Sequence, residues 1–279
     1  MNVWEYFQLD SGKYALIVGA LISLCCAILG VTLVLKRYSM IGDGLSHVAF
    51  GAMTIAMVLT IADMYVMLPV TIIVAILLIR LTDKGKVKND SAIAMLSVGA
   101  LALGYLVVNL FSSAANVSGD VCSTLFGLTT ILTLSNLDLW LCVGLTIFVL
   151  VFFILFHNKI FGVTFDEQFS KANGVKTALY NNIMAIIIGI VIVLAMKLVG
   201  SLLISALIVF PALSAIRLFK SYKMVIIFSS IVGVVNSIIG ILIAVLWGTP
   251  VGATIVIVDI FVYVICWLID IAIRNLKKV

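Results

Sequence analysis

The stretch Met40-Ile41-Gly42-Asp43-Gly44-Leu45-Ser46-His47-Val48-Ala49-Phe50 places two ionisable side chains, Asp43 and His47, at the start of a long apolar segment. Residues four apart in a helix lie on one face, about one turn apart, so this face would carry a carboxylate beside an imidazole. A carboxylate is costly in hydrocarbon and usually faces a bundle interior or a wet cavity. We therefore expect Asp43 and His47 to face the inside of a helical bundle.

Two interpretations of this pair are open from spacing alone. A carboxylate oxygen and an imidazole nitrogen together suit a divalent transition metal, which makes Asp43 and His47 candidate metal ligands. The alternative is structural: Asp43 would be an interfacial acid at a helix start, and His47 would be bonded to a backbone carbonyl.

The composition of the whole chain is that of a polytopic membrane protein. Of its 279 residues, 64% are hydrophobic and only 10% are charged, and the mean hydropathy is +1.33. A soluble domain has about a quarter charged residues. We therefore predict an all-α bundle in the cell membrane, surrounded by lipid, with residues 1–279 forming a single transmembrane domain. The net charge of +5 comes from basic residues grouped in alternate loops, so it does not indicate nucleic-acid binding.

Apolar runs near the length of about 20 residues that a span requires occur nine times. They are Tyr14–Leu35, Ile41–Ile61, Tyr65–Leu81, Ser91–Phe111, Leu137–Phe156, Leu179–Leu198, Leu202–Phe219, Met224–Trp247 and Val251–Ile273. The prediction is eight to nine transmembrane helices. Pro211 lies inside the seventh run, where we expect a kinked or broken helix.

Basic residues set the predicted orientation, because lysine and arginine collect in cytoplasmic loops. All of the 17 basic residues except Lys13 and Lys197 follow the first, third, fifth, seventh or last run. The N-terminus is therefore predicted outside and the C-terminus in the cytoplasm. The segment Asn116–Ser135 would break this alternation as a full span. We predict that it forms a short re-entrant or extracellular helix, which protein or a water cavity must cover.

The one long cytoplasmic connection, residues 158–176, carries a helix signature. Thr164-Phe165-Asp166-Glu167 matches a capping box, with acids where the helix dipole favours them. Asn173-Gly174 is a stop signal. Phe165 and Phe169 are four residues apart and would share a face. Such a helix could dock a partner protein through its exposed rings, or it could lie with those rings among lipid headgroups.

Some motifs are missing from the sequence. No G-x-x-x-x-G-K-[ST] occurs, so the chain has no P-loop of its own for ATP, and no H-E-x-x-H indicates a metalloprotease. The five cysteines show no zinc-site spacing. Asp259, inside the last apolar run, requires a partner or a cavity.

Several stretches together resemble the integral-membrane permeases of ABC importers for zinc, manganese or iron. They are Leu33–Val48 (LVLKRYSMIGDGLSHV), Asp90–Ile93 (DSAI), Leu125–Gly127 (LFG), Phe165–Val175 and Lys197–Ala212 (KLVGSLLISALIVFPA). They cover nearly the whole chain in the family's order. One departure precedes Pro250, where the family often carries an acidic residue and this chain has Gly248-Thr249.

The resemblance implies a permease for a divalent transition-metal ion, working by alternating access. The metal would be the substrate, with no permanently bound cofactor, and Asp43 and His47 would line its path. A separate cytoplasmic ABC ATPase would dock at the coupling segment formed by Phe165, Asp166, Glu167, Phe169 and Gly174. An extracytoplasmic metal-binding protein would deliver the ion, and two copies of the chain would form a homodimer. The chain itself is then no enzyme.

Two other classes compete with this interpretation. A secondary transporter driven by an ion gradient usually shows internal repeats and more polar residues at mid-membrane, and we find no convincing repeat. A membrane-embedded enzyme requires a fuller set of nucleophiles or metal ligands than the sequence offers. An adjacent ATPase gene would favour the importer.

Overall fold

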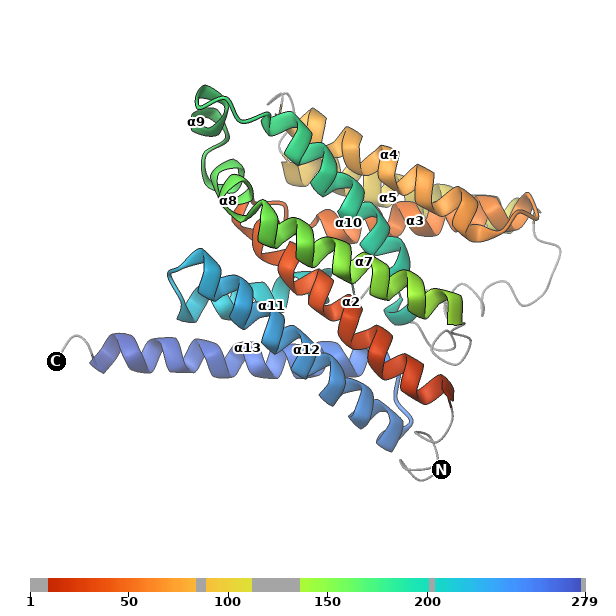
Figure 1. The fold of residues 1–279 in the computed structure, drawn as a ribbon. Helices are drawn as coiled ribbons and strands as arrows, with labels where there is room; N and C mark the ends of the chain where they lie inside the picture. The colour runs from red at the N-terminus through yellow and green to blue at the C-terminus, as the bar shows by residue number, and fades with distance from the viewer. Residues whose placement is uncertain (1–9, 84–88, 112–135, 201–203, 277–279) are drawn as a thin grey trace.

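The computed structural model describes residues 10–83, 89–111, 136–200 and 204–276, and within these ranges all regular secondary structure is α-helical. The helices in chain order (Figure 1) are α2 (Asp10–Leu35), α3 (Ile41–Val58), α4 (Asp63–Asp83), α5 (Asn89–Phe111), α7 (Asn136–Leu155), α8 (His157–Phe165), α9 (Glu167–Ala172), α10 (Thr177–Val199), α11 (Ile204–Leu218), α12 (Tyr222–Trp247) and α13 (Val251–Leu276).

Eight helices in the described ranges are long and apolar enough to cross a membrane: α2, α3, α4, α5, α7, α10, α12 and α13. The prediction of an all-α bundle with eight to nine spans is confirmed. The seventh run gives α11, which has only 15 residues and is shorter than the run predicted. The prediction of a re-entrant or extracellular helix at 116–135 falls outside the described residues, and nothing here tests it.

We predicted a kinked or broken helix at Pro211, and the structure shows that the helix is not broken there. α11 continues from Ile204 to Leu218 with Pro211 inside it. Proline removes one backbone donor, and inside a membrane bundle neighbouring groups can compensate for that loss. The change of direction lies earlier, at Gly200, which ends α10 with φ of +85°, a backbone angle that favours glycine.

α2 occupies the centre of one half of the bundle. It packs against α7, α11 and α12 (Figure 1). Ser23 Oγ donates a hydrogen bond to the carbonyl of Gly233 at 2.7 Å, and Ser229 Oγ donates to the carbonyl of Ala27 at 3.2 Å. Small residues and serine hydroxyls of this kind let helices approach closely within a membrane.

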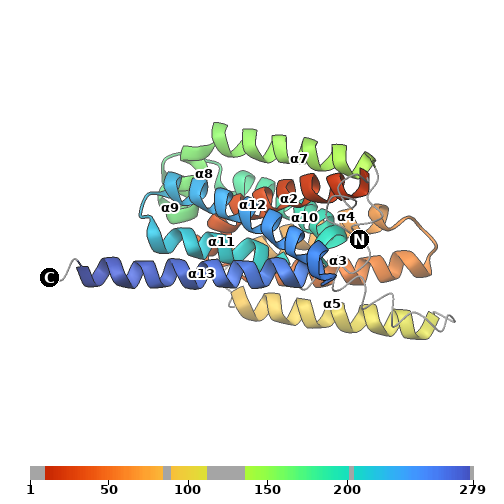
Figure 2. The ribbon, with the colours of Figure 1, turned by 90° about the horizontal axis from the view of Figure 1, so that it is seen from below.

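The other half of the bundle is built around α3 and α10. α3 packs against α4 and α5, and α10 packs against α4 and α3. Figure 2 shows α7 along one edge of the molecule and α5 along the opposite edge, with α2, α10 and α3 between them. Most of α2, α3 and α10 is buried, whereas α4, α5, α7 and α13 leave most of their surface exposed. These four helices therefore leave many apolar side chains exposed on the outside of the bundle.

Candidate functional site

Asp43 and His47 lie side by side in the first two turns of α3. The distance from His47 Nε2 to Asp43 Oδ1 is 3.5 Å. The side chain of His47 is 9% exposed and that of Asp43 is 30% exposed, so the imidazole is buried while the carboxylate reaches an accessible space. This arrangement agrees with the expectation that spacing of four places both groups on one helical face.

Glycines hold this part of α3 close to two neighbouring helices. A Cβ on Gly44 would lie 2.7 Å from Ile93 of α5, and a Cβ on Gly51 would lie 2.9 Å from the carbonyl oxygen of Ala100. A Cβ on Gly42 would lie 2.9 Å from Ile208 of α11. The glycines at these contacts therefore allow α3 to fit between α5 and α11, with His47 between the two α5 contacts along the helix.

Two buried polar atoms near this pair are unsatisfied within the described part of the chain. His47 Nδ1 has no hydrogen-bond partner there, and neither has Ser205 Oγ of α11, the residue that faces Gly42. The Ser46 hydroxyl, in contrast, donates to the carbonyl of Asp43 at 2.8 Å. Because buried polar groups are nearly always paired, these two atoms are candidate contacts for a bound water or ligand. Sequence reasoning missed Ser205, which has no local motif.

The described residues contain no cluster of three or more histidine, cysteine, aspartate or glutamate side chains positioned to hold a metal ion. Asp259 does form the contact that its burial demands: Asn236 Nδ2 of α12 donates to Asp259 Oδ1 at 2.6 Å. This hydrogen bond ties α13 to α12, whereas Asp43 and His47 are on α3. Within the described residues, the second carboxylate oxygen of Asp259 has no partner.

The coupling segment differs from the predicted single capped helix. It forms two short helices, α8 and α9, with extended backbone at Asp166 between them. The cap of α9 is Asp166, whose carboxylate accepts a 2.8 Å hydrogen bond from the Phe169 backbone N–H. Thr164 is not the cap, because its hydroxyl donates to the carbonyl of Ile160 within α8. The stop signal is confirmed: Gly174 follows α9 with φ of +78°.

The two phenylalanines of this segment therefore do not share a helix. Phe165 ends α8, and its ring packs against Phe161 at 4.7 Å between centroids and against Tyr222 at 6.1 Å. Phe169 lies on α9 and is 65% exposed. The prediction of one face carrying both rings is wrong, because the extended Asp166 interrupts the helix. Phe169 is the more exposed of the two rings.

A polar network that sequence reasoning missed joins the coupling segment to the start of α3. Asn181 of α10 donates to both carboxylate oxygens of Glu167 at 3.1 Å each and accepts a 2.6 Å hydrogen bond from Lys36. Lys36 directly precedes Arg37, whose φ of +62° turns the chain between α2 and α3. The network therefore connects α9 with the turn that leads to Asp43.

Comparison with known proteins agrees with this architecture. A model of the ABC 3 transport family matches residues 8–270. The chain is 28% identical over 264 residues to the manganese import system permease protein ScaB of Streptococcus gordonii, covering 95% of this chain and 93% of that protein. It is 27% identical over 252 residues to the high-affinity zinc uptake system membrane protein ZnuB of Haemophilus influenzae, covering 90% and 94%.

A solved structure has the same fold. The structure of PsaBC from Streptococcus pneumoniae in complex with Fab contains a chain that superposes with a TM-score of 0.81 at 25% sequence identity, with 95% of each chain covered. The likeness thus extends over nearly the whole length of both chains.

Proposed function

The chain belongs to the ABC 3 transport family of integral-membrane permeases of metal-importing ABC transporters, and we propose that it carries a divalent transition-metal ion through the cell membrane past Asp43 and His47. The names of its relatives favour manganese or zinc as this substrate. Iron, the third metal that the motifs allow, has no support from those names.

The observation that carries the proposal is the pairing of Asp43 with His47 at 3.5 Å. Oxygen and nitrogen ligands lie about 2.1 Å from zinc, so two donor atoms at this separation would subtend roughly 110° at one metal, close to the tetrahedral angle. The free hydroxyl of Ser205 and the accessible space beside Asp43 leave room for water or a further ligand.

Charge supports the same assignment. A dication entering a low-dielectric bundle loses its hydration, and a carboxylate at the same place offsets part of that cost. The imidazole nitrogen of His47 suits transition metals, whereas hard ions such as magnesium prefer oxygen ligands. The pair would therefore lower the free-energy cost of moving the dication through the bundle and would favour transition metals over magnesium.

ATP hydrolysis would belong to a partner chain, because the relatives of this chain are permease subunits. We assign docking of this separate cytoplasmic ATPase to Phe165, Asp166, Glu167, Phe169 and Gly174, with the exposed Phe169 ring as the principal contact. Movement of α9 would then reach α3 through Glu167, Asn181 and Lys36. Such a transporter alternates between two stable packings, and the ATPase shifts their balance through differential contacts.

Two further partners follow from the family. We propose that two copies of the chain form the permease and that an extracytoplasmic metal-binding protein delivers the ion to it. The basic residues favour an N-terminus outside and a C-terminus in the cytoplasm, which would put α9 on the ATPase side.

The test is ATP-dependent uptake of manganese and zinc by the complex reconstituted in proteoliposomes. Asp43→Asn keeps the size of the side chain but removes its charge, so uptake should nearly cease. His47→Gln should lower uptake and weaken the preference for transition metals over magnesium. Asp63→Asn changes another acid in the first turn of a helix, α4, outside the proposed pair; it is the control and should behave as wild type. Normal uptake by folded Asp43→Asn and His47→Gln would overturn the assignment.

A further inference from the structure

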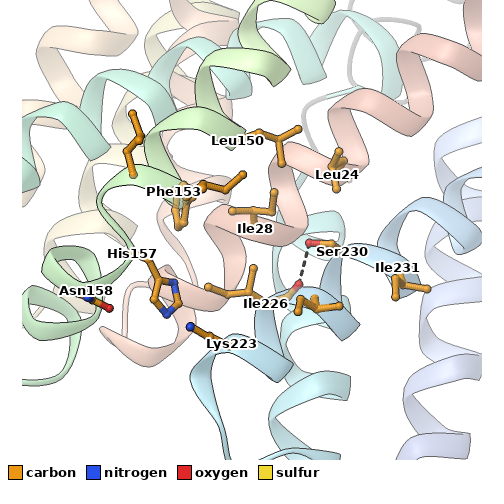
Figure 3. Close-up of a pocket in the computed structure, with 13 residues that line it drawn as sticks. Leu24, Ile28, Leu150, Phe153, His157, Asn158, Lys223, Ile226, Ser230 and Ile231 are labelled. Atoms are coloured by element: carbon orange, nitrogen blue, oxygen red, sulfur yellow. Dashed lines mark hydrogen bonds between the residues drawn. The ribbon is translucent and has the colours of Figure 1, made fainter.

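A groove lies between α2, α7 and α12 (Figure 3), and its lining includes neither Asp43 nor His47. Its volume is about 630 Å³. Ile28 and Phe153 in its lining are buried, while Ile154 and Ile227, also in the lining, are exposed. The groove therefore has a protected floor and open sides on the outside of the described bundle.

The wall of the groove is apolar along the membrane-spanning part. Ser230 is the one hydroxyl residue in this lining, and its Oγ donates a 2.7 Å hydrogen bond to the carbonyl of Ile226 on its own helix (Figure 3). The remaining lining of α2, α7 and α12 in the membrane is aliphatic or aromatic. Its chemistry fits a hydrocarbon chain, because dispersion contacts with an apolar wall are lost wherever no atoms fill the space.

One end of the groove is polar and positively charged. His157, Asn158 and Lys223 line it there, at the junction of α7 with α8 and at the first turn of α12 (Figure 3). Burial and then the nearby Lys223 ammonium lower the pKa of His157, so the imidazole is neutral and can donate one hydrogen bond. The ring packs on Tyr222 with centroids 5.3 Å apart.

Within the described residues, the charge of Lys223 is not balanced by a neighbouring acid. In the described part of the chain, no aspartate or glutamate lies within salt-bridge distance of its ammonium group. Lys223 is also exposed at the mouth of the groove. An ammonium group beside a neutral imidazole and a carboxamide offers several donors and a positive charge, which is complementary to a phosphate.

We propose that this groove binds one anionic phospholipid, with an acyl chain between α2, α7 and α12 and the phosphate at Lys223, His157 and Asn158. Basic pockets beside membrane helices on the cytoplasmic side are suited to anionic headgroups. The volume of about 630 Å³ is in the range of sites that enclose a ligand of moderate size. The proposal does not rest on the transported metal or on the ATPase.

Native mass spectrometry of the detergent-purified full chain tests the site. The probes are dioleoylphosphatidylglycerol, which is anionic, and dioleoylphosphatidylcholine, which has the same acyl chains and no net charge. Wild-type protein should retain the anionic lipid preferentially. Lys223→Gln should weaken its binding about tenfold, because charge-assisted contacts contribute roughly that much, and should leave the neutral lipid unaffected. Lys220→Gln, an exposed lysine outside the groove lining, should match wild type.

A second pair of variants tests the acyl-chain part. Leu150→Trp adds bulk to the groove wall and should weaken binding of both lipids, whereas Ile147→Trp, an exposed residue of α7 outside the lining, should not. Equal loss in Lys220→Gln and Lys223→Gln would mean that only general charge matters, and it would overturn the proposal. The same holds if Leu150→Trp binds both lipids as Ile147→Trp does. Size-exclusion elution and helical content verify that each variant is folded.

Discussion

The close approach of α3 to α5 depends on glycines, which carry a hydrogen atom where other residues carry a Cβ. A Cβ on Gly51 would meet the backbone of α5 at Ala100, and backbone atoms cannot move aside as a flexible side chain can. Gly104 of α5 lies against the same stretch, where its Cβ would come within 3.2 Å of Gly51. The position of Asp43 and His47 relative to α5 is therefore set by glycines, which have no functional side chain of their own.

We predict that Gly51→Ala destabilises the protein by about 1–3 kcal/mol, the usual cost of overpacking a well-packed contact. Gly99→Ala on α5 is the matched control: no atom lies within 4 Å of its Cβ, and alanine favours a helix by about 1 kcal/mol over glycine. Thermal unfolding in detergent measures both. Equal stability of the two variants would contradict the close-contact account.

The sequence predicted that Asp43 and His47 lie side by side because spacing of four on a helix is a local property. It could not find Ser205, which reaches Gly42 from more than 150 residues away in the chain. It also could not find Asn181, whose partners Lys36 and Glu167 are on different helices. Such contacts depend on how helices pack, and no periodicity within one segment reports them.

Among the helices, α9 and α10 form the proposed connection between ATPase docking and transport. Asn181 makes hydrogen bonds to both Glu167 and Lys36, so removing its amide separates α9 from the turn before α3. The exposed ring of Phe169 does not take part in that network. Docking of the ATPase and transmission of its movement should therefore be separable by mutation.

We predict that Asn181→Ala lowers metal uptake per ATP hydrolysed several-fold, because hydrogen bonds to charged groups contribute about 1.5–3 kcal/mol each. The ATPase should still co-purify. Phe169→Ala should do the opposite and weaken co-purification. The control is Asn182→Ala at the next residue. The side-chain amide oxygen of Asn182 accepts a long, exposed hydrogen bond of 3.4 Å from Arg80 Nε. Unchanged coupling in Asn181→Ala would argue against the network.

Helix existence was predictable from composition, but helix ends and caps were not. Long apolar runs have few alternatives in a membrane, because only helices and closed barrels satisfy the backbone there. The prediction of Thr164 as the helix cap was wrong because a second candidate, Asp166, lies two residues later. Asp166 caps α9, and the Thr164 hydroxyl donates to the Ile160 carbonyl within α8. α11 covers Ile204–Leu218 of its apolar run, and Gly200 before it ends α10 with a positive φ.

The whole bundle has charged ends and an apolar middle, and its orientation rests on the distribution of basic residues. We predict that Gln168→Cys, exposed on α9, reacts with a membrane-impermeant maleimide only after cells are opened. Thr249→Cys, exposed in the turn before α13, should react in intact cells. Cys25, Cys26, Cys142 and Cys266 are buried, and wild-type protein provides the background. Labelling of Gln168→Cys from outside would reverse the orientation.

X-ray absorption at the zinc edge of the purified, zinc-loaded full chain tests the central assignment most directly. The chain has only two histidines, His47 and His157, so an imidazole scattering signature is assignable once any histidine tag is removed. We expect wild-type protein to show one imidazole in the zinc shell, His157→Gln to keep it, and His47→Gln to lose it. An imidazole signature that persists in His47→Gln, or is absent from wild type, would contradict the assignment of His47 as a ligand of the transported metal.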